Sequence, residues 1–325
     1  MRSEATSEAM RDLPGEAVLA SIGLDVTQPR AFTSTRRFPD GGAYRLEIPS
    51  VEGPRAMAEV LDEAAKFGVI IHRVSQGSGV FMLSDDEIRR MVALGEASQV
   101  EVCLFLGPRA SWDIGAARGT SAGDQRARAR GRDQLGQALV DAERAAGLGV
   151  SCLLVADEGL VWALHLLRGR RLPADLTIKV SVLSGPSNPL SFQILERLGA
   201  DSINIPSDLT IAQVAEMRSA GSAAIDFYVE APDNIGGFVR HYDVPELVRV
   251  GAPIYLKFGL RNAPDIYPSG AHLDGVVGAS ARERVRRAHL AMSLADRLAP
   301  DLDPSPAGSR VVGPIERFVS AAVVP

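Results

Sequence analysis

Lysine is rare in this sequence, and two of its three lysines lie in apolar segments. Lys179 lies in LTIKVSVLSG (176–185) and Lys257 in PIYLKFGL (253–260), whereas Lys66 lies in a helical pattern. Apolar surroundings and a neighbouring cation lower the affinity of a lysine for its proton, which makes it a nucleophile or a general base near neutral pH. The two lysines therefore predict either an imine with a carbonyl substrate or a fixed positive charge beside an enolate or carboxylate.

Other polar residues alternate with apolar residues in the same kind of segment. If Ile178, Val180 and Val182 face helices, then Lys179 and Ser181 face the opposite side of their strand. The same alternation places further residues on the polar side, namely Glu47, Asn204, Asp226, Tyr228, Glu230, Tyr255 and Lys257. One segment is ambiguous, because either His72, or Arg73 with Ser75, takes that side. Among the neutral and basic residues of this polar side, the candidates for substrate binding are His72, Arg73, Ser75, Ser181, Asn204 and Tyr228.

Three of these residues are carboxylates, Glu47, Asp226 and Glu230, which are candidates for proton transfer beside the lysines. Lys179 is slightly favoured over Lys257 as the reactive amine, because Ser181 and the loop SGPSN follow it. The carboxylates offer a second possibility, a Mg²⁺ or Mn²⁺ ion held by oxygen ligands. The five histidines have no metal-ligand spacing, so we expect a cofactor-free site.

Loops that follow the apolar segments add candidates for substrate binding. SQGSG (75–79) could present backbone N–H groups to a carboxylate or phosphate, although it is equally typical of a plain turn. The long loop 107–125 contains Arg109 and has the length of a lid. Arg261 and Asn262 begin the loop 261–272, where they could meet a substrate anion.

The elements that must position these residues are eight short strands separated by helical patterns. The predicted strands are 44–50, 69–75, 100–107, 150–157, 176–185, 202–207, 223–231 and 253–260. Amphipathic helices are predicted over 53–68, 84–98, 188–200 and 280–299. This order predicts a single (β/α)8 barrel over residues 44–300, with an N-terminal extension (1–43) and a C-terminal tail (301–325) that cap the barrel or serve an oligomer contact. An open doubly wound sheet is disfavoured, because IPSVEGPRA is not a phosphate-binding loop.

Composition restricts the class of protein. Charged residues make up 23% of 325 residues and the net charge is −5, which gives no basic surface for nucleic acid. No run approaches 18 apolar residues and the N-terminus has no apolar signal-peptide core, so we expect a cytoplasmic protein with no membrane partner. The two cysteines, Cys103 and Cys152, lie in strand-like runs as buried hydrophobes. A homo-oligomer, most simply a dimer, is the default expectation.

One region resembles a known family. Residues 149–218 combine a strand and VADEG (155–159), then NPLSFQILERLGA (188–200), then SDLTIAQVAEMR (207–218). This order is similar to the U32 family of collagenase-like peptidases. The resemblance implies a barrel and, for some members, RNA-modifying or hydroxylating activity with an iron–sulfur cluster held by cysteines after the seventh strand. The corresponding loop here, 232–238, has no cysteine, so no cluster and no catalytic residue is carried over.

These observations favour a cofactor-free, aldolase-like lyase or isomerase that acts on a small, oxygenated, anionic substrate at the C-terminal mouth of the barrel. A U32-like peptidase and a divalent-metal-dependent barrel enzyme are the alternatives. A non-catalytic binding barrel is a third, and a buried ion-pair network that only fixes the core is the purely structural explanation. The inward lysines favour the first of these.

Overall fold

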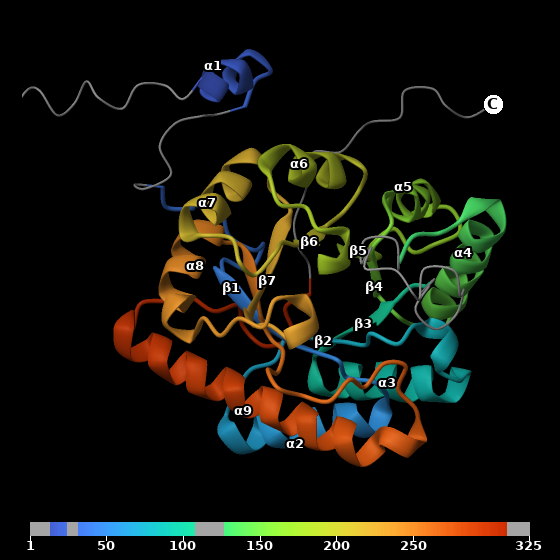
Figure 1. Cartoon of the computed structure of the whole chain (residues 1–325). Coiled ribbons are helices and arrows are strands. Elements are labelled where there is room, and N and C mark those ends of the chain that lie inside the picture. The colour runs from blue at the N-terminus through green and yellow to red at the C-terminus, as the bar shows by residue number, and fades with distance from the viewer. Residues whose placement is uncertain (1–13, 25–31, 108–126, 311–325) are drawn as a thin grey trace, which may run out of the picture.

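A closed barrel of eight parallel strands forms the centre of the molecule (Figure 1). The computed structural model describes residues 14–24, 32–107 and 127–310. Each strand pairs with the next along the chain, and β8 pairs with β1, so the predicted (β/α)8 barrel is confirmed. The strands are β1 (Tyr44–Pro49), β2 (Arg73–Ser75), β3 (Glu101–Phe105), β4 (Cys152–Val155), β5 (Thr177–Val180), β6 (Ser202–Asn204), β7 (Ala224–Glu230) and β8 (Ile254–Phe258).

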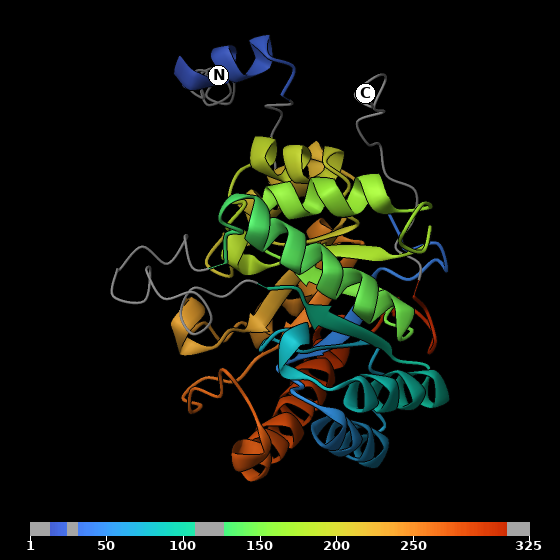
Figure 2. The same ribbon diagram turned by 90° about the vertical axis from the view of Figure 1, so that its right-hand side faces the viewer.

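Helices surround the strands on the outside of the barrel (Figure 2). After the short helix α1 (Pro14–Ser21) they are α2 (Pro54–Phe67), α3 (Asp85–Ser98), α4 (Gly131–Gly147), α5 (Glu158–Leu167), α6 (Pro189–Arg197), α7 (Ile211–Ala220), α8 (Val244–Gly251) and α9 (Asp274–Leu298). Short 3₁₀ turns are η2 (Val80–Met82), η4 (Val182–Ser184), η5 (Asp233–Ile235), η6 (His241–Asp243) and η7 (Ala271–Leu273). The last helix, α9, lies beside α2 and completes the ring (Figure 1). Among the described residues no helix is long and apolar enough to cross a membrane.

Local sequence signals account for most helix ends. Ser84, Asn188 and Thr210 each precede a helix and accept a hydrogen bond from the backbone N–H three residues later. This satisfies one of the N–H groups that the first turn of a helix leaves unpaired. Gly68 ends α2 with a left-handed backbone (φ 65°), which glycine adopts without a steric penalty. These caps place each following or preceding strand in the correct position of the barrel.

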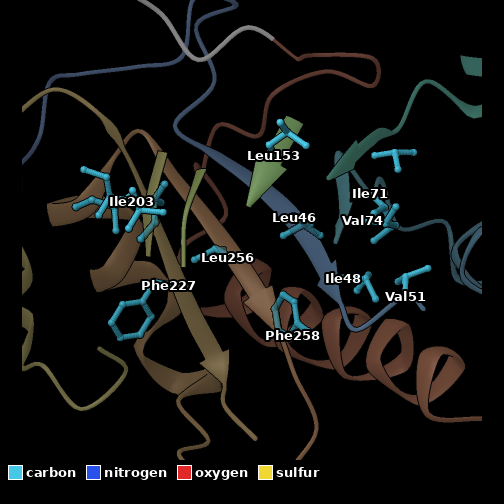
Figure 3. Packing of buried hydrophobic residues seen from close by; sticks show 14 of the residues in the cluster. Leu46, Ile48, Val51, Ile71, Val74, Leu153, Ile203, Phe227, Leu256 and Phe258 are labelled. Atoms are coloured by element: carbon cyan, nitrogen blue, oxygen red, sulfur yellow. The ribbon is translucent and has the colours of Figure 1, made fainter. Parts of the chain in front are cut away.

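The two faces of the barrel strands differ completely in chemistry. The outward face is apolar and packs against the helices, as Figure 3 shows for Leu46, Ile48, Val74, Phe227 and Phe258. All five are buried, and burying one such side chain contributes about 1.5–3 kcal/mol. The inward face carries charged and polar residues and, on β3 and β4, a small apolar cluster that includes Cys103, Phe105, Cys152 and Leu154.

Residues 38–40 of the N-terminal extension and residues 303–305 of the C-terminal tail lie across the N-terminal end of the barrel. Phe38 packs edge-on against Tyr255, and the Arg45 guanidinium stacks on the Phe38 ring at 3.9 Å. The backbone N–H of Ser305 donates to the carbonyl of Tyr44, and the Ser305 hydroxyl donates to Asp40. This end is therefore closed by packed side chains, which leaves the opposite, C-terminal end for a site.

Several predicted boundaries differ from the structure, and the two largest differences have different reasons. β5 ends at Val180 rather than at residue 185, because the Ser181 hydroxyl accepts from Leu183 N–H and begins the turn η4. Val182 thus leaves the helix-facing side of the barrel and is half-buried at the mouth. Helix α9 begins at Asp274 rather than at residue 280, because the glycines in DGVVGAS do not interrupt it once it packs against α2.

Candidate active site

Five charged residues meet on the barrel axis, and we call them the axis cluster: Glu47, Arg73, Glu101, Lys179 and Asp226. The register pairs Glu47 with Arg73 on one side and with Lys257 on the other. The Lys179 ammonium is fully buried; it contacts a Glu47 carboxylate oxygen and lies 2.7 Å from Asp226 Oδ1. Both contacts of the Lys179 ammonium are with carboxylates, so its positive charge is balanced by negative charge from Glu47 and Asp226.

Arg73 is the second cation of the axis cluster. Its Nε donates to Glu101 Oε2 at 2.5 Å, and its Nη1 lies 3.3 Å from Asp226 Oδ1. Its guanidinium also stacks on the Tyr255 ring at 3.8 Å. The ambiguity in the second strand is thus resolved in favour of Arg73 facing inward. Glu101 was missed by the sequence reading, although it begins a buried strand, where an unpaired carboxylate is costly.

His72 faces away from the axis cluster. Its Nδ1 accepts the backbone N–H of Leu46 at 3.1 Å, and its Nε2 lies 2.9 Å from the carbonyl oxygen of Ser305. Burial lowers the pKa of His72 to about 4, so the ring is neutral at pH 7. His72 joins the C-terminal segment to β1 and does not lie at the mouth, in contrast to the predicted substrate-binding role.

Lys257 borders the axis cluster but has different partners. Its Nζ donates to the amide oxygen of Asn204 at 2.6 Å, lies 3.4 Å from Glu47 Oε1, and sits 4.2 Å from the centre of the Tyr228 ring. The Asn204 amide in turn donates to the carbonyl of Val180, which fixes its oxygen toward the lysine. Asn204 and Tyr228 therefore face inward, as the strand pattern predicts.

The two lysines differ in proton affinity because their partners differ. Burial opposes the charge of Lys179, but Asp226 and Glu47 outweigh it and raise its pKa above the ordinary value. Burial, strengthened by the charge of Lys179, lowers the pKa of Lys257 to about 8, although Glu47 opposes this shift. Lys257 is therefore the better candidate for a reactive amine, which reverses the slight preference for Lys179 from the sequence.

The carboxylate of Glu47 remains ionised. Burial would raise its pKa, but the positive charges of Lys179, Lys257 and Arg73 hold the pKa well below its ordinary range. The hydroxyl of Ser75 also donates to Glu47 Oε1 at 2.7 Å. A carboxylate with this set of donors is a strong charge partner and a weak proton acceptor.

Glu230 does not join the other two predicted carboxylates. The pairing of β7 with β8 passes from Tyr228–Lys257 to Glu230–Phe258, so β7 carries one extra residue there. This β-bulge turns Glu230 to the helix-facing side that Phe258 occupies. Its Oε1 accepts the backbone N–H of Arg261, and its Oε2 lies 3.3 Å from His241 Nε2. The predicted set of three carboxylates is therefore split between two faces.

A pocket of about 90 Å³ opens at the C-terminal mouth above the axis cluster. Its lining includes Ser75, Ser181 and Tyr228, which the sequence predicts, together with Ser50 and Tyr267, which it does not. Ser75 and Tyr228 contact Glu47 and Lys257 respectively, so they connect the pocket to the buried charges. Lys257 itself is 2% exposed and does not line the pocket, so a substrate carbon reaches its Nζ only if the side chains between the pocket and the lysine move.

The loop SQGSG (75–79), which is predicted to bind an anion, already binds the carboxylate of Glu52 from the same chain. The carboxylate of Glu52 accepts the backbone N–H groups of Gly77 and Ser78 at 2.8 and 3.0 Å, and the Ser78 hydroxyl at 2.6 Å. Gly77 is required for a second reason, because a Cβ there would lie 2.7 Å from the ring of Tyr267. The loop SQGSG thus supports Tyr267 at the mouth, and its N–H groups at 77 and 78 are occupied.

The residues predicted to meet a substrate anion after β8 are also engaged elsewhere. Arg261 Nε donates to Asp233 Oδ1 at 3.0 Å, and the backbone N–H of Asn262 donates to Asp233 Oδ2 at 2.5 Å. Both contacts join the loop after β8 to the loop after β7, and neither residue lines the pocket. Arg109 and the proposed lid lie outside the described residues.

Metal-ligand geometry is absent from the part of the chain that the structure describes. No group of three or more His, Cys, Asp or Glu side chains is arranged there to hold an ion. Cys103 and Cys152 are neighbours in the register of β3 and β4, and both are buried free thiols inside the barrel. Their sulfurs lie 2.9 Å apart, and both residues belong to a buried apolar cluster with Phe105 and Leu154.

Comparisons with known proteins leave the family open. No protein-family model and no curated protein matches the chain. Among solved structures it is similar to the YdjI aldolase from Escherichia coli K12 (15% identity, 77% of this chain, 91% of that one, TM-score 0.47). It is similar to the U32 peptidase Mk0906 (17% identity, 73% of this chain, 96% of that one, TM-score 0.42). It is also similar to a truncated 3-deoxy-D-arabino-heptulosonate 7-phosphate synthase from Thermotoga maritima (13% identity, 79% of this chain, 89% of that one, TM-score 0.43). At these identities and TM-scores the likeness assigns no activity.

Proposed function

We propose that this protein is an aldolase-like lyase or isomerase, and that Lys257 is its reactive amine. The observation that carries the proposal is the contrast between the two buried lysines. Lys179 is held by two carboxylates, whereas Lys257 donates to a neutral amide and lies against Tyr228, which lines the mouth pocket. The carboxylate of Glu47 lies at the longer distance of 3.4 Å from Lys257. A buried amine with weaker charge compensation is the one that loses its proton near neutral pH.

The proposed step begins with attack by the neutral Lys257 amine on the carbonyl carbon of the substrate. The carbonyl oxygen takes one proton from the amine and one from Tyr228 or solvent and leaves as water, and an iminium ion remains on Nζ. The iminium accepts the electron pair of a C–C or C–H bond on the adjacent carbon, and an enamine forms. Ionised Glu47, 3.4 Å from Nζ, would stabilise the iminium charge. Burial raises the pKa of Tyr228, so its hydroxyl stays protonated and could donate to the departing oxygen.

A broken C–C bond releases an aldehyde whose former hydroxyl proton passes to water, and a broken C–H bond gives its proton to water. Protonation of the enamine and addition of water then release the product and restore the amine.

The test is reduction with borohydride in the presence of small aldehydes, ketones and 2-oxo acids, followed by peptide mass spectrometry. We expect a reduced adduct on Lys257 and none on Lys179. With only three lysines in the chain, exposed Lys66 reports non-specific reaction in the same sample. Lys257→Met should abolish the adduct. No adduct on Lys257 across the whole panel, or one on Lys179 instead, would refute the proposal.

The alternatives predicted from sequence receive less support. Peptide hydrolysis of the U32 type rests on the resemblance of residues 149–218, and no contact among the described residues favours it specifically. A Mg²⁺ or Mn²⁺ site built from Glu47, Asp226 and Glu230 would need the three carboxylates on one face, whereas Glu230 lies on the other. A peptide library and a metal titration of the same preparation test these two activities.

The localisation, the oligomeric state and the partners of the protein stay predictions. We propose a cytoplasmic homo-oligomer whose partner is a small molecule, without nucleic acid or membrane. Light scattering coupled to size-exclusion chromatography would give the number of chains directly. A mass equal to one chain across the working concentration range would contradict the oligomer.

A further inference from the structure

A second pocket of about 160 Å³ adjoins the first at the mouth of the barrel. The two pockets share Ser50, Pro232, Asn234 and Tyr267 in their linings. The Ser50 and Tyr267 hydroxyls lie 2.5 Å apart and form the wall between the pockets. A small molecule could therefore place one group in each pocket, on either side of this wall.

Arg284 of α9 lines only the second pocket, and its charge is poorly compensated. The residue is 3% exposed, yet it forms no ion pair with any described residue. Its Nη1 makes one long hydrogen bond, 3.4 Å, to the carbonyl of Ser50, and its Nε has no hydrogen-bond partner among the described residues. A buried guanidinium in this condition is costly unless an anion pairs with it.

The backbone conformation of Ser50 allows this residue to contact both Arg284 and Tyr267. Ser50 follows β1 with a left-handed backbone (φ 60°), which is uncommon for a residue with a side chain. In this conformation its carbonyl meets Arg284 while its hydroxyl meets Tyr267. A single residue thus fixes both the cation of the second pocket and the wall between the pockets.

We propose that Arg284 binds the carboxylate of the substrate. Guanidinium and carboxylate match as planar partners in paired hydrogen bonds. The rest of the lining favours a monoanion over a phosphate dianion, because Asp233 and Asp265 also border the pocket and Arg261 pairs with only one of them. The substrate class is then a small oxo acid whose carbonyl and carboxylate are separated by a few carbons, so that the carbonyl lies on the Tyr228 side of the wall. This assignment rests on the proposed function for the carbonyl and on Arg284 alone for the carboxylate.

The sequence contains a signal for Arg284 that strand reasoning did not use. Along α9 the buried residues Val277, Ala281, Val285 and Ala288 recur at helical spacing, and Arg284 lies within that apolar stripe. Its neighbours Arg282 and Arg286 are exposed and pair with glutamates. An arginine on the buried face of a helix requires a partner. Among the described residues no carboxylate lies within ion-pair distance of Arg284, although Glu52 and Glu230 interact with its charge from farther away.

The experiment measures binding of acetate, 4-oxopentanoate and 5-oxohexanoate, each against its neutral amide, by calorimetry on the full chain. It uses Lys257→Met protein, so that no imine can form and the result does not depend on the proposed chemistry. We expect at least one acid to bind about tenfold or more tightly than its amide. Adding Arg284→Met should remove that preference while affinity for the amide is kept, which also shows that the variant is folded.

Arg286→Met on the same helix is the matched control and should keep the preference. Arg284→Lys retains the charge without the planar fork and should retain part of the preference; it replaces Arg284→Met if that variant does not fold. The proposal is overturned if no acid is preferred over its amide, or if the preference survives in the Arg284→Met protein. Tighter binding of inorganic phosphate than of any acid would overturn the choice of a carboxylate.

Discussion

The barrel axis and the mouth of the barrel both contain buried cations, but the number of carboxylates that pair with these cations differs. On the axis, Lys179 and Arg73 lie within 3.5 Å of two and three carboxylates respectively. At the mouth, Arg284 donates to one distant carbonyl. Lys257, which borders the axis cluster, donates to an amide and among the described residues pairs only with Glu47, at 3.4 Å, a carboxylate that it shares with Lys179 and Arg73. A cation with close carboxylate partners contributes to the structure, whereas one that lacks a carboxylate or shares a distant one is available to a ligand.

The same difference separates the role of the axis cluster from the role of the mouth. The axis cluster contains two cations and three carboxylates, so its own charges leave one negative charge that a protonated Lys257 balances. Deprotonation of Lys257 therefore leaves an excess negative charge inside the barrel, and an iminium on the same nitrogen would restore the balance. On this view the axis cluster is the electrostatic support of the amine and does not itself contact substrate.

The largest expected effect concerns Lys179. Lys179→Met removes the common partner of Glu47 and Asp226 and leaves buried carboxylates with less compensation, which should cost about 3–5 kcal/mol in the free energy of unfolding. Denaturant titration measures the change. The exposed Lys66→Met, which loses only a pair with Glu63, should cost less than about 1 kcal/mol. A loss below 1 kcal/mol for Lys179→Met would place this lysine among the cations available to a ligand.

The next effect is the pH dependence of stability due to Lys257. The pKa is about 8 in the folded protein and 10.5 is its ordinary value. Between these values the folded state has released a proton that the unfolded state keeps, so stability should rise with pH, by on the order of 2–3 kcal/mol between pH 8 and pH 10. Lys257→Met should lack this rise in denaturant titrations at each pH. Identical slopes for the two proteins would show that Lys257 is compensated like Lys179.

A smaller effect, of opposite sign to that at Lys179, is expected at Arg284. Arg284→Met replaces an uncompensated buried charge by an apolar side chain, so stability should stay unchanged or increase by up to about 1 kcal/mol. Arg218 is the matched comparison, because it is buried but donates to the carbonyls of Gly221 and Ala223. Arg218→Met should destabilise by more than about 1 kcal/mol. If Arg284→Met destabilises as much in thermal unfolding, its role is structural.

The smallest effect tests the wall between the two pockets. Tyr267→Phe removes the hydrogen bond to Ser50 and should cost about 1 kcal/mol, because the Ser50 hydroxyl loses its partner at a part-buried position. Tyr242→Phe, at a residue 76% exposed, should leave the melting temperature unchanged. A melting temperature for Tyr267→Phe equal to that of the unmodified protein would mean that the wall does not depend on this bond.

Much of the barrel could be predicted from local pattern. The order of eight strands and the inward direction of Glu47, Lys179, Asn204, Asp226 and Lys257 follow from alternation along single strands. The sequence did not reveal the bulge at Glu230, because an extra residue in one strand shows only against its partner. It also could not locate the end of β5, where a serine side chain forms a turn with its own backbone.

The sequence by itself determined that charged residues line a barrel of apolar outer faces, because strand periodicity is a property of each segment alone. Only the tertiary structure decided which charges pair. Lys179 and Lys257 lie in similar segments, yet one meets two carboxylates and the other an amide and an aromatic ring. Arg284 and Ser50 are 234 residues apart and meet only in the folded chain. Pairing depends on strand register and closure of the barrel, and these set the proton affinity that distinguishes a structural cation from a reactive one.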